Sequence, residues 1–342
     1  MTQASIATMS AQPTTPIGRR LSRVARQQFA TWGILPLLLI VLVITFAAME
    51  PRFLSGGNVL NVARQVSFLG IITIGQMFYL VTRNYDLSNG ATVALASIAC
   101  ATVMTSMPDA GLWTAIAAGC GAALAVGLVV GLINSVLIAA LKISSFIVTL
   151  GVASAGTGMA LMISGGMPVT GLPPEFTRSF GTSMVAGIPF PTFVMILVIA
   201  AAYVLFTWTR VGRHAYAAGG NESAAFQSGV NVRRVLFVMM ISGSLLAALV
   251  GVLITARVST GEANIGVTYP LLSIIAAVLG GISLNGGEGR VAGAFMGALF
   301  IVLLSNGMDL IRVQSYVQQI LLGALLVAAL IIDRLRTRVR LT

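Results

Sequence analysis

Long apolar runs, separated by short polar segments, make up most of the chain. A helix needs about 20 residues to cross the hydrocarbon core of a bilayer, which is about 30 Å thick. Runs of roughly this length predict ten membrane-spanning helices, at 33–49, 64–82, 88–107, 112–138, 145–163, 190–208, 235–256, 268–284, 291–308 and 315–332. The pattern therefore predicts an all-α polytopic membrane protein.

The composition agrees with this pattern. Of the 342 residues, 57% are hydrophobic and only 8% are charged, and the mean hydropathy is +0.96. Because a soluble domain carries about 25% charged residues, the composition excludes a soluble enzyme, a disordered scaffold and a coiled coil. We expect a flexible basic N-terminal tail (1–30), one membrane domain (31–333) and a basic C-terminal tail (334–342).

The basic residues predict how the chain is oriented. Arginines cluster before the first run and after the last one, and cytoplasmic segments of membrane proteins are enriched in Lys and Arg. Ten spans with both termini in the cytoplasm leave only five of the 20 basic residues outside: Arg52, Arg64, Arg178, Arg257 and Arg312. The net charge of +11 does not indicate nucleic-acid binding, because no soluble domain is present to carry a basic face.

Two connections are long enough to carry structure of their own. The external one, 164–189, is rich in Gly and Pro, so little helix is expected there. The cytoplasmic one, 209–234, predicts a short surface helix with Asn221 as its N-cap, Glu222 in its first turn and Gly229 as the residue that ends it. This helix is interpreted either as a docking element for a partner or as a charged loop without a partner.

A weak internal repeat relates the two halves of the chain. Residues 134–151 (NSVLIAALKISSFIVTLG) and 306–323 (NGMDLIRVQSYVQQILLG) each lie at the junction of two predicted spans, five spans apart. An odd offset gives the two copies opposite orientations, which is the inverted repeat found in many transporters.

The residues needed for catalysis are missing. The only histidine is His214, so neither HExxH nor a Ser–His–Asp triad is available, and the only lysine, Lys142, does not follow a glycine as a Walker A motif requires. Cys100 and Cys120 lie in apolar runs without CxxC spacing and are interpreted as small hydrophobic residues. We therefore predict no enzyme activity, no cofactor and no metal site in this chain.

Neutral polar residues lie where a carrier of ions would place charges. They suggest a path for an uncharged, hydroxyl-rich solute, although each could equally form a helix–helix hydrogen bond. The candidates are the neutral residues Gln76, Ser88, Asn89, Asn134 and Asn306, together with Asp86 between the second and third predicted spans. Glycines spaced by four residues predict close helix packing at Gly127 and Gly131, and at Gly289, Gly293 and Gly297.

Four blocks give the chain a family resemblance over roughly residues 50–333. The most specific is GRHAYAAGGNESAAFQSGVNVRRV (212–235), and the others are 131–151, 275–293 (IAAVLGGISLNGGEGRVAG) and 305–333. With these blocks the sequence resembles the permease subunits of bacterial ABC importers for ribose, xylose and related monosaccharides.

The resemblance implies a type II ABC importer fold in the bacterial inner membrane. It implies a homodimeric pore, a periplasmic sugar-binding protein that delivers solute, and partner subunits that bind ATP and Mg²⁺ and hydrolyse the ATP. It also implies that residues 219–229 couple to the ATPase: Gly219, Gly220, Asn221, Glu222 and Gly229, with Ala224, Ala225 and Ser228 facing a groove on that partner.

One block departs from the family pattern. The family's G-G-I-D-L-S-V-G appears here as RNYDLSNG, with Arg83, Asn84 and Tyr85 in place of two glycines and a small apolar residue. A path lined by this segment would select a different solute. The alternatives are the related permease branch for branched-chain amino acids or urea, and a stand-alone secondary carrier.

Overall fold

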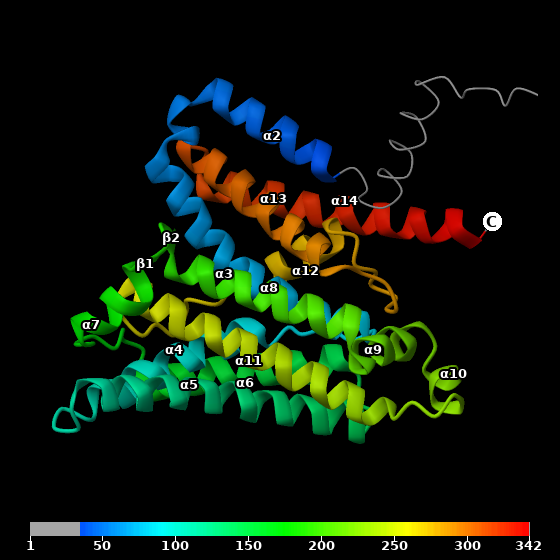
Figure 1. Ribbon diagram of the computed structural model, residues 1–342, viewed down its shortest axis with the longest axis horizontal. Coiled ribbons are helices and arrows are strands. Elements are labelled where there is room, and N and C mark those ends of the chain that lie inside the picture. The colour runs from blue at the N-terminus through cyan, green and yellow to red at the C-terminus, as the bar shows by residue number, and fades with distance from the viewer. Residues whose placement is uncertain (1–34, 342) are drawn as a thin grey trace, which may run out of the picture.

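Each of the ten predicted runs forms a helix in the computed structural model, which describes residues 35–341 (Figure 1). These helices are α2 (Leu35–Met49), α3 (Gly56–Val81), α4 (Asn89–Thr105), α5 (Leu112–Ser135), α6 (Ser145–Ser164), α8 (Phe190–Trp208), α11 (Val232–Val258), α12 (Tyr269–Leu279), α13 (Val291–Leu310) and α14 (Ser315–Leu341). Six of them are long and apolar enough to cross a membrane, whereas α2, α4, α12 and the apolar part of α14 are shorter.

Shorter elements gather at the two ends of the bundle (Figure 1). At one end, called here the hairpin end, lie η1 (Pro51–Leu54), α7 (Pro174–Phe176), the π-helical turn η3 (Thr177–Thr182), and strands β1 (Met184–Val185) and β2 (Ile188–Pro189). The opposite end, called the α10 end, carries the π-helical turn η2 (Val136–Ala140), α9 (Arg210–Gly220) and α10 (Glu222–Gln227).

The long connection 164–189, which was predicted to be external, is more ordered than its composition predicted. Residues 174–182 form continuous helical turns, started by Pro174, whose ring fixes φ at a helical value. Phe176 anchors them because its side chain is completely buried against residues of α4, α5 and α11. The hairpin that follows turns through Ala186 and Gly187, which both have positive φ, as a two-residue β-turn of this kind requires.

Two of the short helices begin inside the bundle. After α3 and after α11 the chain continues as an irregular segment, residues 82–88 and 259–268, and the next helix starts where these segments meet. A Cβ added at Gly90 would lie 2.3 Å from the Gly266 carbonyl oxygen, and one added at Gly266 would lie 2.0 Å from the Gly90 oxygen. α4 and α12 therefore start within the bundle and are shorter than the spanning helices.

The two halves share an unusual backbone feature. Arg83 and Ser259, which follow α3 and α11, have φ near +60°, and so do Lys142 and Arg312 in the α5–α6 and α13–α14 turns. α3 ends at the α10 end, whereas α11 begins there. The corresponding turns consequently lie at opposite ends of the bundle, as in an inverted repeat.

Most of the predicted packing glycines lie against a neighbouring helix. Added Cβ atoms at Gly127 and Gly131 would lie within 2.7 Å of α11, and those at Gly293 and Gly297 within 2.1 Å of the α12 chain or the Gly280 that follows it. Gly289 was assigned to the wrong role. It precedes α13, its φ of +150° is one that L-residues rarely adopt, and the atom nearest to an added Cβ belongs to the Ile282 side chain, at 3.0 Å.

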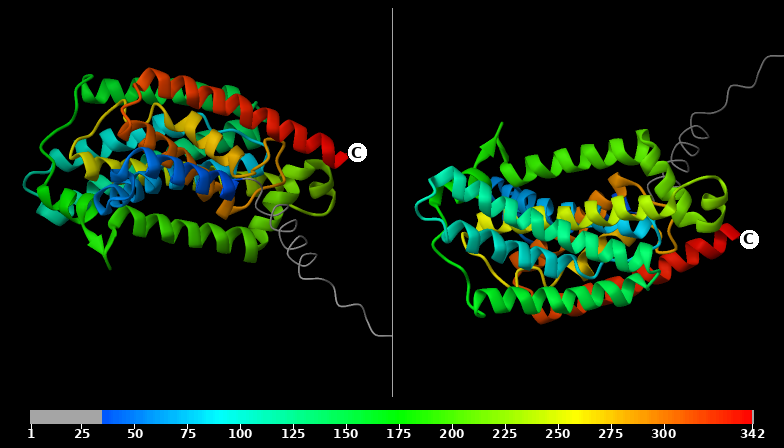
Figure 2. Two further views of the ribbon diagram at one scale, coloured as in Figure 1. Left: turned by 90° about the horizontal axis from the view of Figure 1, so that it is seen from above. Right: turned by 90° about the horizontal axis from the view of Figure 1, so that it is seen from below.

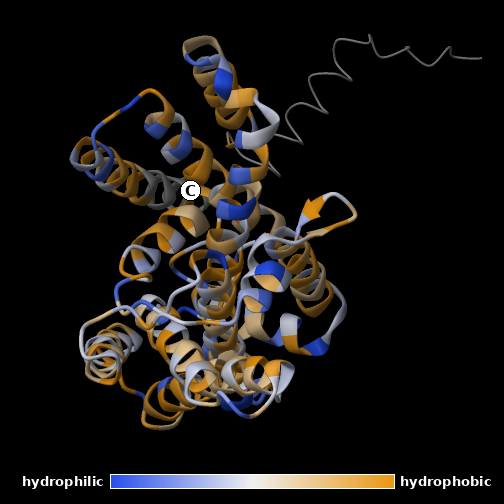
Figure 3. Cartoon of the chain, turned by 90° about the vertical axis from the view of Figure 1, so that its left-hand side faces the viewer, coloured by the Kyte–Doolittle hydropathy of each residue, from blue (hydrophilic) through white to orange (hydrophobic). Residues whose placement is uncertain are grey.

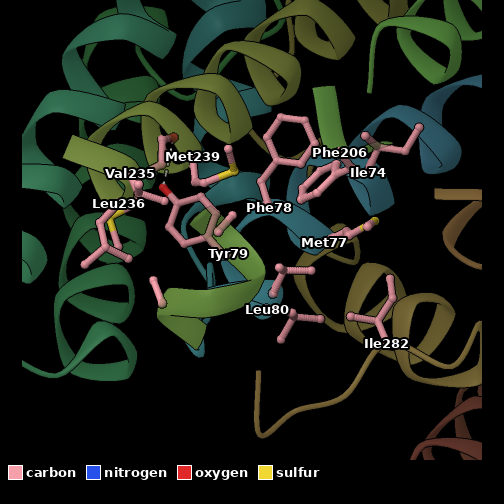
Figure 4. Packing of buried hydrophobic residues seen from close by; sticks show 14 of the residues in the cluster. Ile74, Met77, Phe78, Tyr79, Leu80, Phe206, Val235, Leu236, Met239 and Ile282 are labelled. Carbon is pink, nitrogen blue, oxygen red and sulfur yellow. Dashed lines mark hydrogen bonds between the residues drawn. The ribbon is translucent and has the colours of Figure 1, made fainter. Parts of the chain in front are cut away.

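The core lies around α3 and α11. Tyr79 is completely buried there, and Phe78 meets Phe206 edge to face with 5.2 Å between ring centroids (Figure 4). By contrast, α6 and α14 lie along one face and α8 along the opposite face (Figure 2). Apolar residues cover the helices around the bundle (Figure 3). In the apolar 18-residue stretch of α6, and in that of α8, only 22% of the residues are buried.

The expected tails are only partly described. Residues 1–30 lie outside the described part of the chain. Residues 334–341 continue α14, so most of the expected C-terminal tail is the last part of a helix.

Candidate functional site

Polar side chains meet where α4 and α12 begin. The amide groups of Gln76 on α3 and Asn89 on α4 hydrogen-bond at 3.0 Å, and the Asn89 amide also lies 3.2 Å from the Ser273 hydroxyl on α12. All three side chains are buried, with at most 3% of their surface exposed. Since an unpaired buried polar group costs several kcal/mol in an apolar environment, about 2–7 by transfer scales, these contacts hold three helices together.

A second group of buried side chains surrounds Asp86. Its Oδ1 accepts hydrogen bonds from the Ser88 backbone N–H (2.8 Å) and hydroxyl (2.6 Å). The Asn134 amide on α5 donates to the Ser88 and Tyr79 hydroxyls, at 3.0 and 3.2 Å. Together the two groups bring five of the six predicted path residues into one buried network.

Two oxygens of this network lack a partner. The side-chain oxygens of Asn89 and Asn134 are buried, and neither accepts a hydrogen bond from any described residue. Buried polar atoms are nearly always hydrogen-bonded in folded proteins. Because both atoms are enclosed by the network, they can accept a hydrogen bond from a hydroxyl-bearing molecule only after the helices around them have separated.

Asn306 lies apart from the network. It is near the end of α13 at the hairpin end, and its amide exchanges two hydrogen bonds with Asn58 at the start of α3, at 2.8 and 3.0 Å. It therefore joins α13 to α3. Its partner could not be identified from the sequence, because 248 residues separate the two amides.

The irregular segment before α4 is held by hydroxyl groups on α6 whose partners the sequence analysis did not identify. The Tyr85 backbone N–H donates to the Ser145 hydroxyl and the Leu87 N–H donates to the Thr149 hydroxyl, both at 3.1 Å. The Thr149 hydroxyl also lies 3.3 Å from the Tyr85 carbonyl oxygen. Two hydroxyls spaced by four residues on one helix face were the only signal in the sequence.

The predicted surface helix is present, with the predicted caps. The Asn221 side chain accepts from the Ala224 N–H at 3.0 Å, and Glu222 lies in the first turn. At the other end Gly229 has φ +81°. Its N–H donates to the Phe226 carbonyl and the Val230 N–H to the Ala225 carbonyl, at 2.9 and 3.0 Å, which is a Schellman cap.

The exposed face of α10 differs from the predicted one. Ala224 and Ser228 are exposed as expected, but Ala225 is 5% exposed and packs into the core around α3 and α11. Its side chain is therefore an anchor and is not available to a partner. Phe226, which was not predicted, is 72% exposed and is the largest apolar side chain on the face.

Close backbone contacts join the end of α9 to the bundle. A Cβ added at Gly219 would lie 1.8 Å from the Val81 carbonyl oxygen at the end of α3, and that oxygen accepts from the Gly287 N–H at 2.9 Å. The Tyr216 hydroxyl donates to the Gly289 carbonyl at 2.8 Å, and burial raises the pKa of Tyr216 against the opposing effect of the Arg290 charge. Gly220 has no such close contact.

A cavity of about 370 Å³ lies at the α10 end. The departing triplet Arg83, Asn84 and Tyr85 lines it from the end of α3, and Lys142 and Glu222 line it from the α5–α6 turn and from α10. The Lys142 ammonium forms an ion pair with the Glu222 carboxylate. The triplet thus lies next to the surface helix, whereas the two unpaired amide oxygens lie where α4 begins.

Comparisons with known proteins identify the family. The family described as "Branched-chain amino acid transport system / permease component" matches residues 58–330. The ribose import permease protein of Bacillus subtilis (strain 168) is 39% identical over 297 residues, which cover 86% of this chain and 90% of the relative.

Two further relatives are similar in extent. The D-allose transport system permease protein of Escherichia coli (strain K12) is 34% identical, covering 87% of this chain and 90% of the relative. The galactose/methyl galactoside import permease protein of Salmonella typhimurium (strain LT2) is 32% identical, covering 92% and 98%. No solved structure gives a significant match. The chain therefore belongs to this permease family of ABC importers, and it is a multi-pass membrane transport component rather than an enzyme.

Proposed function

We propose that this chain is the membrane-spanning subunit of an ABC importer for a monosaccharide. The relatives described above are import permeases for ribose, allose and galactose or methyl galactoside, which supports a sugar as the solute. In this proposal a periplasmic binding protein delivers the sugar, a second copy of the chain completes the pore, and partner ATPase subunits bind ATP and Mg²⁺.

The observation that carries the proposal is the exposed face of α10. This helix is capped at both ends and lies beyond the ends of α8 and α11 (Figure 1). Phe226 is 72% exposed, whereas Ala225 anchors the helix in the core. A rigid, protruding helix with an exposed aromatic residue is a suitable docking element for an ATPase, since aromatic residues are enriched where protein partners bind.

The distribution of charge supports the proposed orientation. Eleven basic residues of the described chain lie at the α10 end and four at the hairpin end, while Arg64 lies within α3. The first group is Arg83, Lys142, Arg210, Arg213, Arg233, Arg234, Arg290 and, at the end of α14, Arg334, Arg336, Arg338 and Arg340; the second is Arg52, Arg178, Arg257 and Arg312. By the positive-inside rule the α10 end faces the cytoplasm, which agrees with ten inverted-repeat spans and two cytoplasmic termini in the inner membrane.

The buried network supports a neutral, hydroxyl-rich solute. In the structure it is closed, and its amides and hydroxyls join α3, α4, α5 and α12. When these helices separate, the oxygens of Asn89 and Asn134 can accept hydrogen bonds from sugar hydroxyls. A branched-chain amino acid fits the network less well for two reasons. The Asp86 carboxylate, which would have to bind the amino group, is already hydrogen-bonded. The network also contains no cation to bind the carboxylate of the amino acid.

The decisive experiment measures uptake in proteoliposomes that contain the chain with its ATPase and binding protein. We expect ATP-dependent accumulation of radiolabelled ribose, allose or galactose, and none of leucine. Leucine uptake would favour the amino-acid branch of the family. Accumulation driven by an ion gradient, with the chain alone and without nucleotide, would overturn the ABC assignment.

The docking face is tested separately. Phe226→Asp places a charge on the exposed face of α10 and should abolish co-purification of the ATPase. Met167→Asp is the matched control, because Met167 is similarly exposed (70%) but lies at the hairpin end, and it should co-purify the ATPase as the wild type does. Equal recovery from both variants would remove α10 from the interface.

A further inference from the structure

Lys142 connects the surface helix to the membrane helices. It lies in the turn between α5 and α6, and its ammonium forms an ion pair with Glu222, the first residue of α10. Its φ of +58° falls in a region that costs a residue other than glycine conformational energy. The turn therefore keeps a lysine where a glycine would be less strained.

This ion pair contributes little to the stability of the folded protein. Both side chains are more than half exposed, at 61% and 57%, and exposed ion pairs contribute little to folding stability. A strained residue in a pair of little energetic value suggests a role in function. That role would be to transmit movement between the two elements that the pair joins.

The first turns of α6, which follow directly after this turn, contact the irregular segment before α4. Ser145 and Thr149, in the first turns of α6, accept hydrogen bonds from the backbone N–H groups of Tyr85 and Leu87. Alternate residues of an extended chain point to opposite sides. Residues 85 and 87 thus bond to α6, while Asp86 and Ser88 belong to the buried network.

The burial of α6 allows it to move with its neighbours. Only 22% of the residues in the apolar 18-residue stretch of α6 are buried, against 89% for that of α3. A shift of α6 therefore disturbs few packed side chains. Hydrogen bonds, in contrast, fix its start to the segment 85–88. A movement of α10 can therefore reach the buried network through the Lys142 turn and α6, while the α3 core stays in place.

We propose that Lys142 is a positioning residue that couples α10 to the segment 85–88, through the α5–α6 turn and the hydroxyls of Ser145 and Thr149. The proposal rests on the docking of the ATPase at α10. When the ATPase displaces α10, the ion pair moves the α5–α6 turn with it. The start of α6 moves with that turn and pulls on segment 85–88, which in this structure keeps the start of α4 closed.

The test compares Lys142→Gln with Arg234→Gln in the complete transporter. Arg234 is an exposed cation at the same end, in the first turn of α11, and neither ion pair among the described residues includes it. We expect Lys142→Gln to co-purify and activate the ATPase but to move about 3- to 10-fold less sugar per ATP hydrolysed, the size of effect expected for residues that modulate coupling. Arg234→Gln should match the wild type.

Charge exchange distinguishes a link from a purely structural role. Lys142→Glu and Glu222→Lys should each lower the sugar-to-ATP ratio, and the double variant, which restores an ion pair of reversed polarity, should recover it. Thr149→Val, which removes the other end of the link, should lower the ratio too. Combining Thr149→Val with Lys142→Gln should give no further loss. Both substitutions interrupt the same set of contacts, so their effects should not add.

The outcomes separate the two proposals. A wild-type ratio in Lys142→Gln with the ATPase bound overturns the link and leaves the docking face intact, and so does a failure of the double exchange to recover the ratio. If Phe226→Asp keeps the ATPase bound, the docking proposal fails instead. Should Lys142→Gln not fold, the charge exchange and Thr149→Val still decide the question.

Discussion

Gly219→Ala should disrupt the joint at the α10 end, whereas Gly220→Ala should not. A Cβ at position 219 would lie 1.8 Å from the Val81 carbonyl oxygen and 2.8 Å from the Gly287 nitrogen. These are backbone atoms, which cannot rotate away, so α9 must shift by more than an ångström. At position 220 the nearest atom is the Gly287 Cα at 4.0 Å, an ordinary contact distance.

The expected cost follows from three contributions. Overpacking costs about 1–3 kcal/mol, and loss of the Gly287-to-Val81 hydrogen bond, 2.9 Å long, costs about 1 kcal/mol. Replacing glycine by alanine within a helix returns about 1 kcal/mol, since position 219 lies in α9. The net loss is about 2 kcal/mol for Gly219→Ala, and Gly220→Ala should be neutral or slightly stabilising.

Thermal unfolding in detergent, followed by size-exclusion chromatography, measures the difference. We expect the midpoint of Gly219→Ala to fall by about 4 °C, at about 2 °C per kcal/mol for a chain of this size, and that of Gly220→Ala to stay at or above the wild-type value. The amount of ATPase that co-purifies with Gly219→Ala should fall as well, because α10 directly follows the displaced end of α9. Equal midpoints for the two variants would refute the contact argument.

Three further predictions test the ends of the bundle. Replacing residues 83–85 by Gly-Gly-Ile should change which sugars are taken up without preventing assembly, and identical uptake spectra would remove this segment from the path. The Glu50 carboxyl should titrate with a pKa of about 2, because it accepts hydrogen bonds from Arg52. Its contribution to stability is thus complete above its unfolded pKa and is lost as the pH falls through about 2. Arg52→Gln should raise the pKa of that carboxyl toward 4.5 in an NMR titration, but the backbone N–H of residue 52, which also donates to it, should keep the pKa below that value. Reporter fusions at 170–180 and at 340 should report opposite sides of the membrane, and signals from one side would contradict the topology.

Features that depend on neighbouring residues could be predicted from the sequence. The caps of α10 are of this kind, since Asn221 and Gly229 lie within a few residues of the groups they satisfy. The helical runs are another, because hydropathy is counted along one segment. Where a sequence pattern crossed a structural boundary the prediction was wrong, as for Gly289, which continued the four-residue spacing beyond the start of α13.

Features that depend on distant segments could not be predicted. Hydropathy does not show where a run stops being helical, so α12 was expected to continue to residue 284, whereas it ends at Leu279. The burial of Ala225 and the pairing of Asn306 with Asn58 depend on which helices meet. The same applies to Thr149, since a hydroxyl in an apolar helix usually bonds to its own backbone, as this one also does at 2.8 Å to the Ser145 carbonyl.

The broken helix before α4 itself explains why a link from α6 exists. Inside a membrane protein, backbone groups outside a helix must find partners within the protein, because no water is available to them. The N–H groups of Tyr85 and Leu87 find theirs in the hydroxyls of Ser145 and Thr149. The bonds that make an irregular segment tolerable at this depth also fasten it to a weakly packed helix. The break that places a buried polar network between α4 and α12 thereby acquires a connection through which movement at the surface can reach that network.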